Sequence, residues 1–206
     1  MNAMDQASTA ARGGFVARPL TPGRWDDLEA LFHARGCSVA RGCWCMYYRV
    51  SGSGEPLRPQ ESRRSRNQAA LRELVRVGPP PGLIGYRDDR PVGWLSLGPR
   101  EHYAKLARSP VMKPVDAQPV WSVICFVVPS EYRGQGVPQA LLAAGVAYAR
   151  LQGAAMLEAY PVDRSAPSAP DASWFGSARM FRAAGFQEVA RRSPGRPVMR
   201  LALGPA

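Results

Sequence analysis

A loop with two glycines, placed between an apolar stretch and a helical pattern, carries the clearest chemical signal in this chain. It spans residues 133–138, reads Arg-Gly-Gln-Gly-Val-Pro, and follows the apolar run Val120 to Val128. Glycine lets the backbone come close to a ligand because it has no Cβ. The first turn of a helix adds unpaired N–H groups and the positive end of the helix dipole. We therefore expect a cradle for a phosphate or diphosphate, with the charge of Arg133 beside it.

Two common phosphate-binding loops do not fit this segment. It lacks the Gly-Lys-Ser/Thr of nucleotide triphosphatases. The chain also lacks an early Gly-x-Gly-x-x-Gly with an acidic residue after a second strand, which disfavours a dinucleotide fold. An ordinary strand–turn–helix with two turn glycines stays open as the alternative.

The loop resembles the acyl-CoA diphosphate loop of the GCN5-related N-acetyltransferase (GNAT) superfamily. That pattern is Arg/Gln-x-x-Gly-x-Gly/Ala, and residues 133–138 match it except at the last position. Pro138 has no N–H, so one phosphate donor is lost there. Proline is favourable in the first helical turn, so a helix start is still expected.

A second segment, Met180 to Phe186, resembles the GNAT pattern Leu-Tyr-x-x-x-Gly-Phe. The family's tyrosine often protonates the departing CoA thiolate, and Phe181 stands in its place without a hydroxyl. A thiolate whose conjugate acid has a pKa of about 8.5 can leave without a dedicated acid. A water, Ser177 or Tyr160 could also replace the tyrosine. The same apolar residues would serve equally well as core.

The resemblance implies acetyl-CoA as acyl donor and direct attack by a primary amine, with no covalent acyl-enzyme. The pantetheine arm would enter between two parallel strands, 120–128 and 155–160, where they splay apart. The expected donor-binding residues are Cys125, Phe126, Val127, Arg133, Gly134, Gln135, Gly136, Val137, Pro138, Trp174, Ser177 and Phe181.

No acidic residue on the strand 120–128 can take the proton of an attacking ammonium. The nearest alternatives are Glu101 and His102, just after the third strand, and Glu158 on the fifth. Each of them also fits a surface or structural role. The candidate proton-transfer residues are Glu101, His102, Tyr160 and Ser177.

Cysteines cluster in one segment after the first helix. His33, Cys37, Cys43 and Cys45 lie within thirteen residues, a set of ligands that zinc can use, but their spacing is not that of a standard zinc knuckle. We favour an apolar, aromatic wall for the acceptor over a metal site. The expected wall residues are Trp44, Cys45, Tyr47 and Tyr48.

Periodicity places these segments on a mixed α/β fold. We expect about seven strands in a mostly antiparallel, twisted sheet and about four helices on its two faces. Strands are expected at 15–20, 83–87, 91–97, 121–128, 155–160, 186–190 and 198–203, and helices at 22–35, 60–77, 139–151 and 174–184. Their order is the GNAT order, in one domain over residues 15–206. Residues 1–14 are expected to be disordered, and 37–59, 99–119 and 161–172 to be insertions, the first of them irregular or extended up to residue 50.

Composition limits the alternatives. The 206-residue chain has 46% hydrophobic residues and a net charge of +11, and all but two of its 27 basic residues are arginines. It has no run long enough to span a bilayer, so we expect a soluble, cytoplasmic protein with no membrane partner. Scattered arginines without a nucleic-acid module make a basic nucleic-acid-binding role the weaker alternative. A non-catalytic CoA-binding sensor or scaffold stays open, as do a homodimer and a protein acceptor instead of the favoured small molecule.

Overall fold

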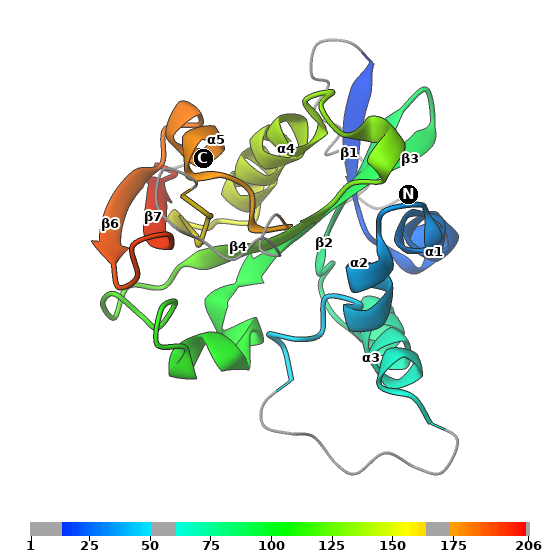
Figure 1. Cartoon of the computed structure of the whole chain (residues 1–206), viewed down its shortest axis with the longest axis horizontal. Coiled ribbons are helices and arrows are strands. Elements are labelled where there is room, and N and C mark those ends of the chain that lie inside the picture. Colours follow the sequence, from blue (N-terminus) through cyan, green and yellow to red (C-terminus); the bar gives the residue numbers. More distant parts are fainter. Residues whose placement is uncertain (1–13, 51–60, 164–173, 205–206) are drawn as a thin grey trace.

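A seven-stranded sheet forms the centre of the protein, with the strand order β1-β2-β3-β4-β5-β7-β6 (Figure 1). The computed structural model describes residues 14–50, 61–163 and 174–204. The strands are β1 Phe15–Pro19, β2 Gly82–Arg87, β3 Arg90–Pro99, β4 Trp121–Val127, β5 Met156–Ala159, β6 Gln187–Arg191 and β7 Pro197–Ala202. All neighbours pair antiparallel except β4 and β5, which are parallel. The expected mixed, mostly antiparallel sheet is confirmed.

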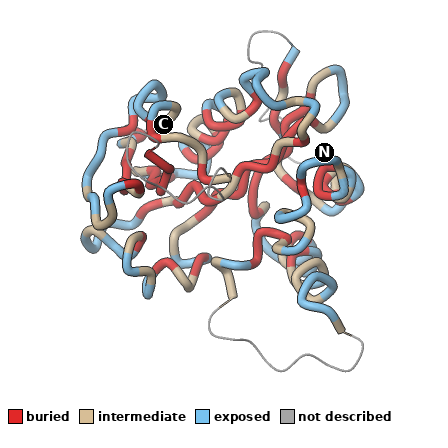
Figure 2. Tube along the Cα trace, in the orientation of Figure 1, coloured by how far each residue is buried: buried red, intermediate tan, exposed pale blue. Residues whose placement is uncertain are grey.

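Helices cover both faces of the sheet. They are α1 Trp25–His33, α2 Ser38–Cys43, α3 Arg63–Val77, α4 Val137–Leu151 and α5 Ala178–Ala183. Helices α4 and α5 lie on one face, and α1, α2 and α3 on the other (Figure 1). Helix α4 buries one stripe of residues at intervals of three and four, including Leu141, Tyr148 and Ala149, so it packs flat on the sheet. Buried residues accordingly follow the strands and the inner faces of the helices (Figure 2).

The parallel strands β4 and β5 separate part-way along their length. They pair from Trp121, opposite Leu157, to Val123, opposite Ala159. Strand β4 then continues through Val127 without a β5 partner, while it stays paired to β3. One edge of the second half of β4 is therefore open, as expected of strands that splay.

Two local expectations were wrong. Residues 38–43 form the short helix α2 instead of an irregular or extended segment. Helix α5 begins at Ala178 and not at Trp174, because Gly176 adopts a left-handed φ of +74° that a helix cannot continue through. Ser177 caps α5 instead, its Oγ accepting the Met180 N–H at 3.2 Å.

Several expectations concern segments outside the described residues. They are residues 1–13 of the start expected to be disordered, residues 51–59 of the first insertion and most of the insertion at 161–172. The insertion at 99–119 contains two short 3₁₀ helices, Arg100–His102 and Ala104–Arg108. Within the described ranges, the longest helices are too short or too polar to cross a bilayer.

Candidate functional site

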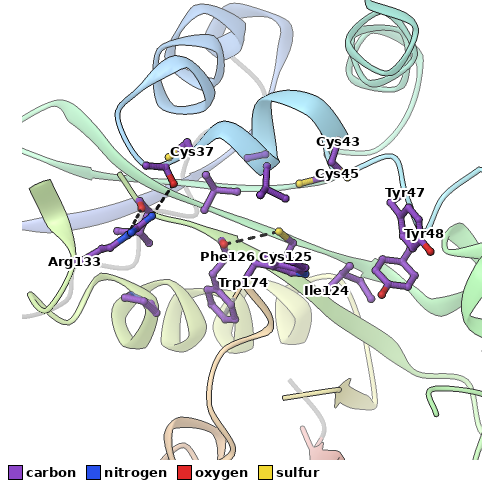
Figure 3. Close-up of a pocket in the computed structure, with 16 residues that line it drawn as sticks. Cys37, Cys43, Cys45, Tyr47, Tyr48, Ile124, Cys125, Phe126, Arg133 and Trp174 are labelled. Atoms are coloured by element: carbon purple, nitrogen blue, oxygen red, sulfur yellow. Dashed lines mark hydrogen bonds between the residues drawn. The ribbon is translucent and has the colours of Figure 1, made fainter. Parts of the chain in front are cut away.

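A cavity of about 890 Å³ lies between the second half of β4 and the segment that contains α2 (Figure 3). It extends from the 133–138 loop at one end to two tyrosines at the other. Sixteen residues line it: Gly36, Cys37, Val39, Ala40, Cys43, Cys45, Tyr47, Tyr48, Ile124, Cys125, Phe126, Val127, Val128, Arg133, Pro138 and Trp174. One cavity thus joins the expected phosphate loop to most of the expected acceptor wall.

The loop at the start of α4 presents free backbone donors. Gly134 and Gly136 have left-handed φ values of +75° and +74°, and a Cβ built on either would meet nothing within 4 Å. No side chain caps the helix, and the described backbone bonds include none donated by residues 134–137. Free N–H groups, open space and a helix N-terminus together suit a phosphate group.

Two arginines hold this loop in place. Arg87, the last residue of β2, donates to Gln135 at its Oε1 (2.9 Å) and its backbone oxygen (2.7 Å). Arg133 donates to the carbonyls of Gly36 (2.7 Å) and Val128 (3.3 Å). Arg133 therefore links the phosphate loop to the turn between α1 and α2 (Figure 3). The part played by Arg87 was missed, because nothing in the sequence relates a strand end to a loop so far along the chain.

Two thiols meet across the cavity. The thiols of Cys45 and Cys125 are close enough to interact, and the indole N–H of Trp94 donates to the Cys45 sulfur at 3.3 Å. The interaction with the Cys125 thiol is the main reason that the pKa of Cys45 lies below that of an ordinary thiol, and the Trp94 N–H and the charge of Arg49 add to the effect. The same interaction, together with burial, raises the pKa of Cys125 well above its usual value. Cys45 is thus the more easily ionised partner.

The acceptor wall differs in detail from the expected one. Tyr47 and Tyr48 pack edge to face at the far end of the cavity, and burial raises the pKa of Tyr48 to about 12. Trp44 does not line the cavity: it is fully buried and stacks on Trp25 behind the wall. Helix α2 takes its place, and Val39, Ala40 and Cys43 face the space. Ala40 and Cys43 are three residues apart, and Val39 and Cys43 are four apart. This helical spacing was the signal in the sequence that could have predicted α2.

The expected proton-transfer residues lie away from this cavity. Glu101 and His102 are exposed, and they follow Pro99, which pairs with Trp121 at the start of β4. The phosphate loop follows the other end of that strand, so the length of β4 separates them from it. Ser177 has its Oγ engaged in capping α5.

Tyr160 belongs to a buried polar network and does not line the cavity. Its hydroxyl donates to Glu158 Oε1 at 2.6 Å and lies 3.0 Å from Ser122 Oγ. Burial, followed by the charge of Glu158, raises the pKa of Tyr160 well above its usual value. Glu158 is itself fully buried and pairs with Arg100 (2.5 Å) and Arg200 (2.7 Å), so it serves the structure and not the cavity.

The remaining donor-side residues divide into two groups. Trp174 lines the cavity with Cys125, Phe126 and Val127. Phe181 is fully buried against Phe126 and Phe186, in the core under α4 and α5. Across residues 14–50, 61–163 and 174–204, no three His, Cys, Asp or Glu side chains are grouped closely enough to hold a metal ion.

Comparison with protein families decides what kind of domain this is. The family model described as "Acetyltransferase (GNAT) family" matches residues 44–169. The chain belongs to the GNAT acetyltransferase family. Its match includes β4, the phosphate loop and α4, which border the cavity, whereas the opposite wall formed by α2 precedes the matched residues.

Solved GNAT structures share this fold over nearly the whole chain. The GNAT domain of S. lividans PAT is 17% identical, with a TM-score of 0.56 over 98% of this chain and 99% of that one. A Drosophila melanogaster polyamine N-acetyltransferase is 16% identical, with a TM-score of 0.52 over 92% and 100%. An acetyltransferase from Thermus thermophilus is 18% identical, with a TM-score of 0.50 over 92% and 97%. At these identities the likeness establishes the fold alone. No curated protein matches the chain significantly.

Proposed function

We propose that this GNAT protein transfers an acetyl group from acetyl-CoA to the primary amine of a small acceptor, by direct attack in a ternary complex. One observation carries the proposal. A single cavity runs from Arg133 and Pro138, which flank the free N–H groups of residues 134–137, along the open edge of β4 to the wall formed by α2 and the two tyrosines. Donor and acceptor can then occupy one space at the same time, as direct transfer requires.

The phosphate loop would hold the diphosphate of the donor. Backbone N–H groups of residues 134–137 suit its oxygens, and Arg87 and Arg133 keep the loop in its shape. Acetyl-CoA supplies the acyl group as a thioester, which amines attack readily. The unpaired edge of β4 from Ile124 to Val127 offers main-chain groups to the pantetheine arm, in the manner of an added strand.

The open edge of β4 would also assist the chemical step. A strand N–H directed into the cavity can donate to the thioester oxygen as negative charge develops on it. Apolar walls around that point keep water away and strengthen the interaction. No nucleophilic side chain is required for this transfer.

The attacking amine must be neutral, and the cavity favours that form. None of the sixteen lining residues is an Asp or Glu, whereas Arg133 is one of them and the charge of Arg49 acts on Cys45. Burial in an apolar space and nearby positive charge both lower the pKa of an amine. The surroundings can therefore do part of the work that a carboxylate base does in other acyl transfers.

The direct test is release of free CoA thiol from acetyl-CoA across a panel of primary amines. The proposal predicts turnover with at least one small amine and the acetylated amine as product in mass spectrometry. Tight binding of acetyl-CoA without turnover of any amine or protein acceptor would instead favour a non-catalytic CoA-binding domain. Phe181 in the place of the family's tyrosine is the observation that keeps this second function open.

A further inference from the structure

The charges around the acceptor end of the cavity are positive and lack carboxylate partners among the described residues. Arg196 lies with its guanidinium carbon 4.1 Å from the ring centre of Phe175, and its guanidinium also contacts the sulfur of Met112 at 3.8 Å. Arg49 donates to the Pro81 carbonyl (3.3 Å) and the Tyr103 hydroxyl (2.9 Å), and its buried Nε has no partner in the described part of the chain. Neither arginine forms an ion pair with a described residue.

Arg196 does not line the cavity itself but lies directly behind its lining. Phe175, on which it packs, contacts Tyr48 and Trp174, and both of these line the cavity. The positive charge of Arg196 also opposes the rise in the pKa of the Tyr48 hydroxyl, so the two groups are close. Burial lowers the pKa of Arg196, which means that its charge is not fully solvated. A partly desolvated guanidinium close to a cavity wall is well suited to an anion.

The acidic residues near this end are already engaged. Asp116 pairs with Arg200 at 2.5 Å, and Glu158 lies between Arg100 and Arg200. Glu188 pairs with Arg191 at 2.6 Å. A second ammonium group on the acceptor would therefore enter a space with cations at its edge and no described carboxylate free to receive it.

We propose that the acceptor is an amine with an apolar body and a carboxylate, and that Arg196 binds this carboxylate at the Tyr48–Phe175 edge of the cavity. The inference rests on the proposed acetyl transfer and names the acceptor class. Arg196 is then a specificity-determining residue. The polyamine class acted on by the Drosophila melanogaster neighbour would be a poor match for this cavity, although the folds agree.

The first experiment varies the acceptor with the wild-type protein. Phenylalanine, its amide and phenethylamine present the same ring beside a carboxylate, a neutral amide and no further group, and 1,4-diaminobutane adds a second cation. The inference predicts that kcat/KM is highest for the carboxylate compound, by about 10-fold or more over the amide. Equal or higher kcat/KM for the amide or the diamine would overturn it.

The second experiment varies the protein. Arg196→Gln should lower kcat/KM for the carboxylate acceptor about 10- to 100-fold through KM and leave the amide nearly unchanged. Arg196→Lys should restore part of the loss. Arg72→Gln is a matched control, because Arg72 also packs on a ring, that of Trp25, which does not line the cavity. An equal loss for acid and amide in Arg196→Gln would mean a structural role and overturn the assignment.

The two proposals fail in different ways. Turnover of amines with no preference for a carboxylate would leave acetyl transfer standing and remove the acceptor assignment. No turnover of any amine, with acetyl-CoA still bound, would remove acetyl transfer and the acceptor assignment with it. Urea midpoints measured for each variant separate loss of fold from loss of binding.

Discussion

At the scale of single residues, Cys45 and Cys125 show how the fold sets chemistry that the sequence does not reveal. The Cys-x-Cys of residues 43–45 and the distant Cys125 give no sign of a contact, but the fold brings Cys45 and Cys125 together. Trp44 and Cys45 both have left-handed φ values, +49° and +52°, which turn the indole into the core and the thiol toward the cavity. This backbone turn explains why neighbouring residues of the expected wall lie in different places.

The first prediction concerns the acidity of these thiols. Thiolate is the form that alkylates, the pKa of Cys45 is lowered and that of Cys125 is raised. We expect iodoacetamide to label Cys45 at a lower pH than Cys125. Acetyl-CoA should slow the reaction because both thiols face the same cavity. Peptide mass spectrometry shows which of the two cysteines is alkylated first, and the chain unfolded in urea is the control. Labelling of Cys125 before Cys45 would contradict the assignment of Cys45 as the more acidic thiol.

At the scale of elements, the strength of the periodic signal decided what could be predicted. Helix α4 has fifteen residues with one apolar stripe, and it was expected within two residues of its observed start at Val137. Helix α2 has only six residues, too short for its spacing to stand out. The splay of β4 from β5 followed from the family resemblance and is confirmed by their pairing. The links made by Arg87 and Arg133 join distant segments, so they could not be predicted from local pattern.

The second prediction tests how closely α4 packs on the sheet. A Cβ on Gly145 would lie 2.7 Å from Leu95 Cδ2, so a larger side chain must push the helix away from β3. Gly145→Leu should destabilise the fold by about 1–3 kcal/mol, measured by urea unfolding. Ala143→Leu, on the exposed side of the same helix, is the matched control. Equal urea midpoints for the two variants would show that α4 does not rest on β3 in this way.

At the scale of the whole molecule, a buried ion network joins elements on both sides of the β4–β5 pair. Glu158 on β5 binds Arg200 on β7 and Arg100 in the 3₁₀ helix after β3, and Arg200 also binds Asp116. These residues lie far apart in the chain, so the sequence predicted Glu158 as a possible base and not as the centre of this network. The network lies beside the splay and holds the two halves of the sheet together.

The third prediction concerns this network. Removing a buried charge leaves its partners uncompensated, so Glu158→Ala should cost about 3–5 kcal/mol of unfolding free energy. Glu73→Ala removes an exposed ion pair with Arg76 and should leave the urea midpoint close to that of the wild type. A wild-type midpoint for Glu158→Ala would show that the two arginines find other partners and that the network does not hold the sheet.

The central claim is that the loop before α4 binds the diphosphate of acetyl-CoA, and calorimetric titration of acetyl-CoA tests it most directly. Gly136→Asp places a carboxylate among the free N–H groups of the loop. Gly153→Asp makes the same change beyond the other end of α4, at a similar left-handed φ and with the same open space. We predict wild-type affinity for Gly153→Asp and at least about a tenfold loss for Gly136→Asp, because the added charge opposes the diphosphate. Unchanged affinity in a folded Gly136→Asp protein would contradict the account.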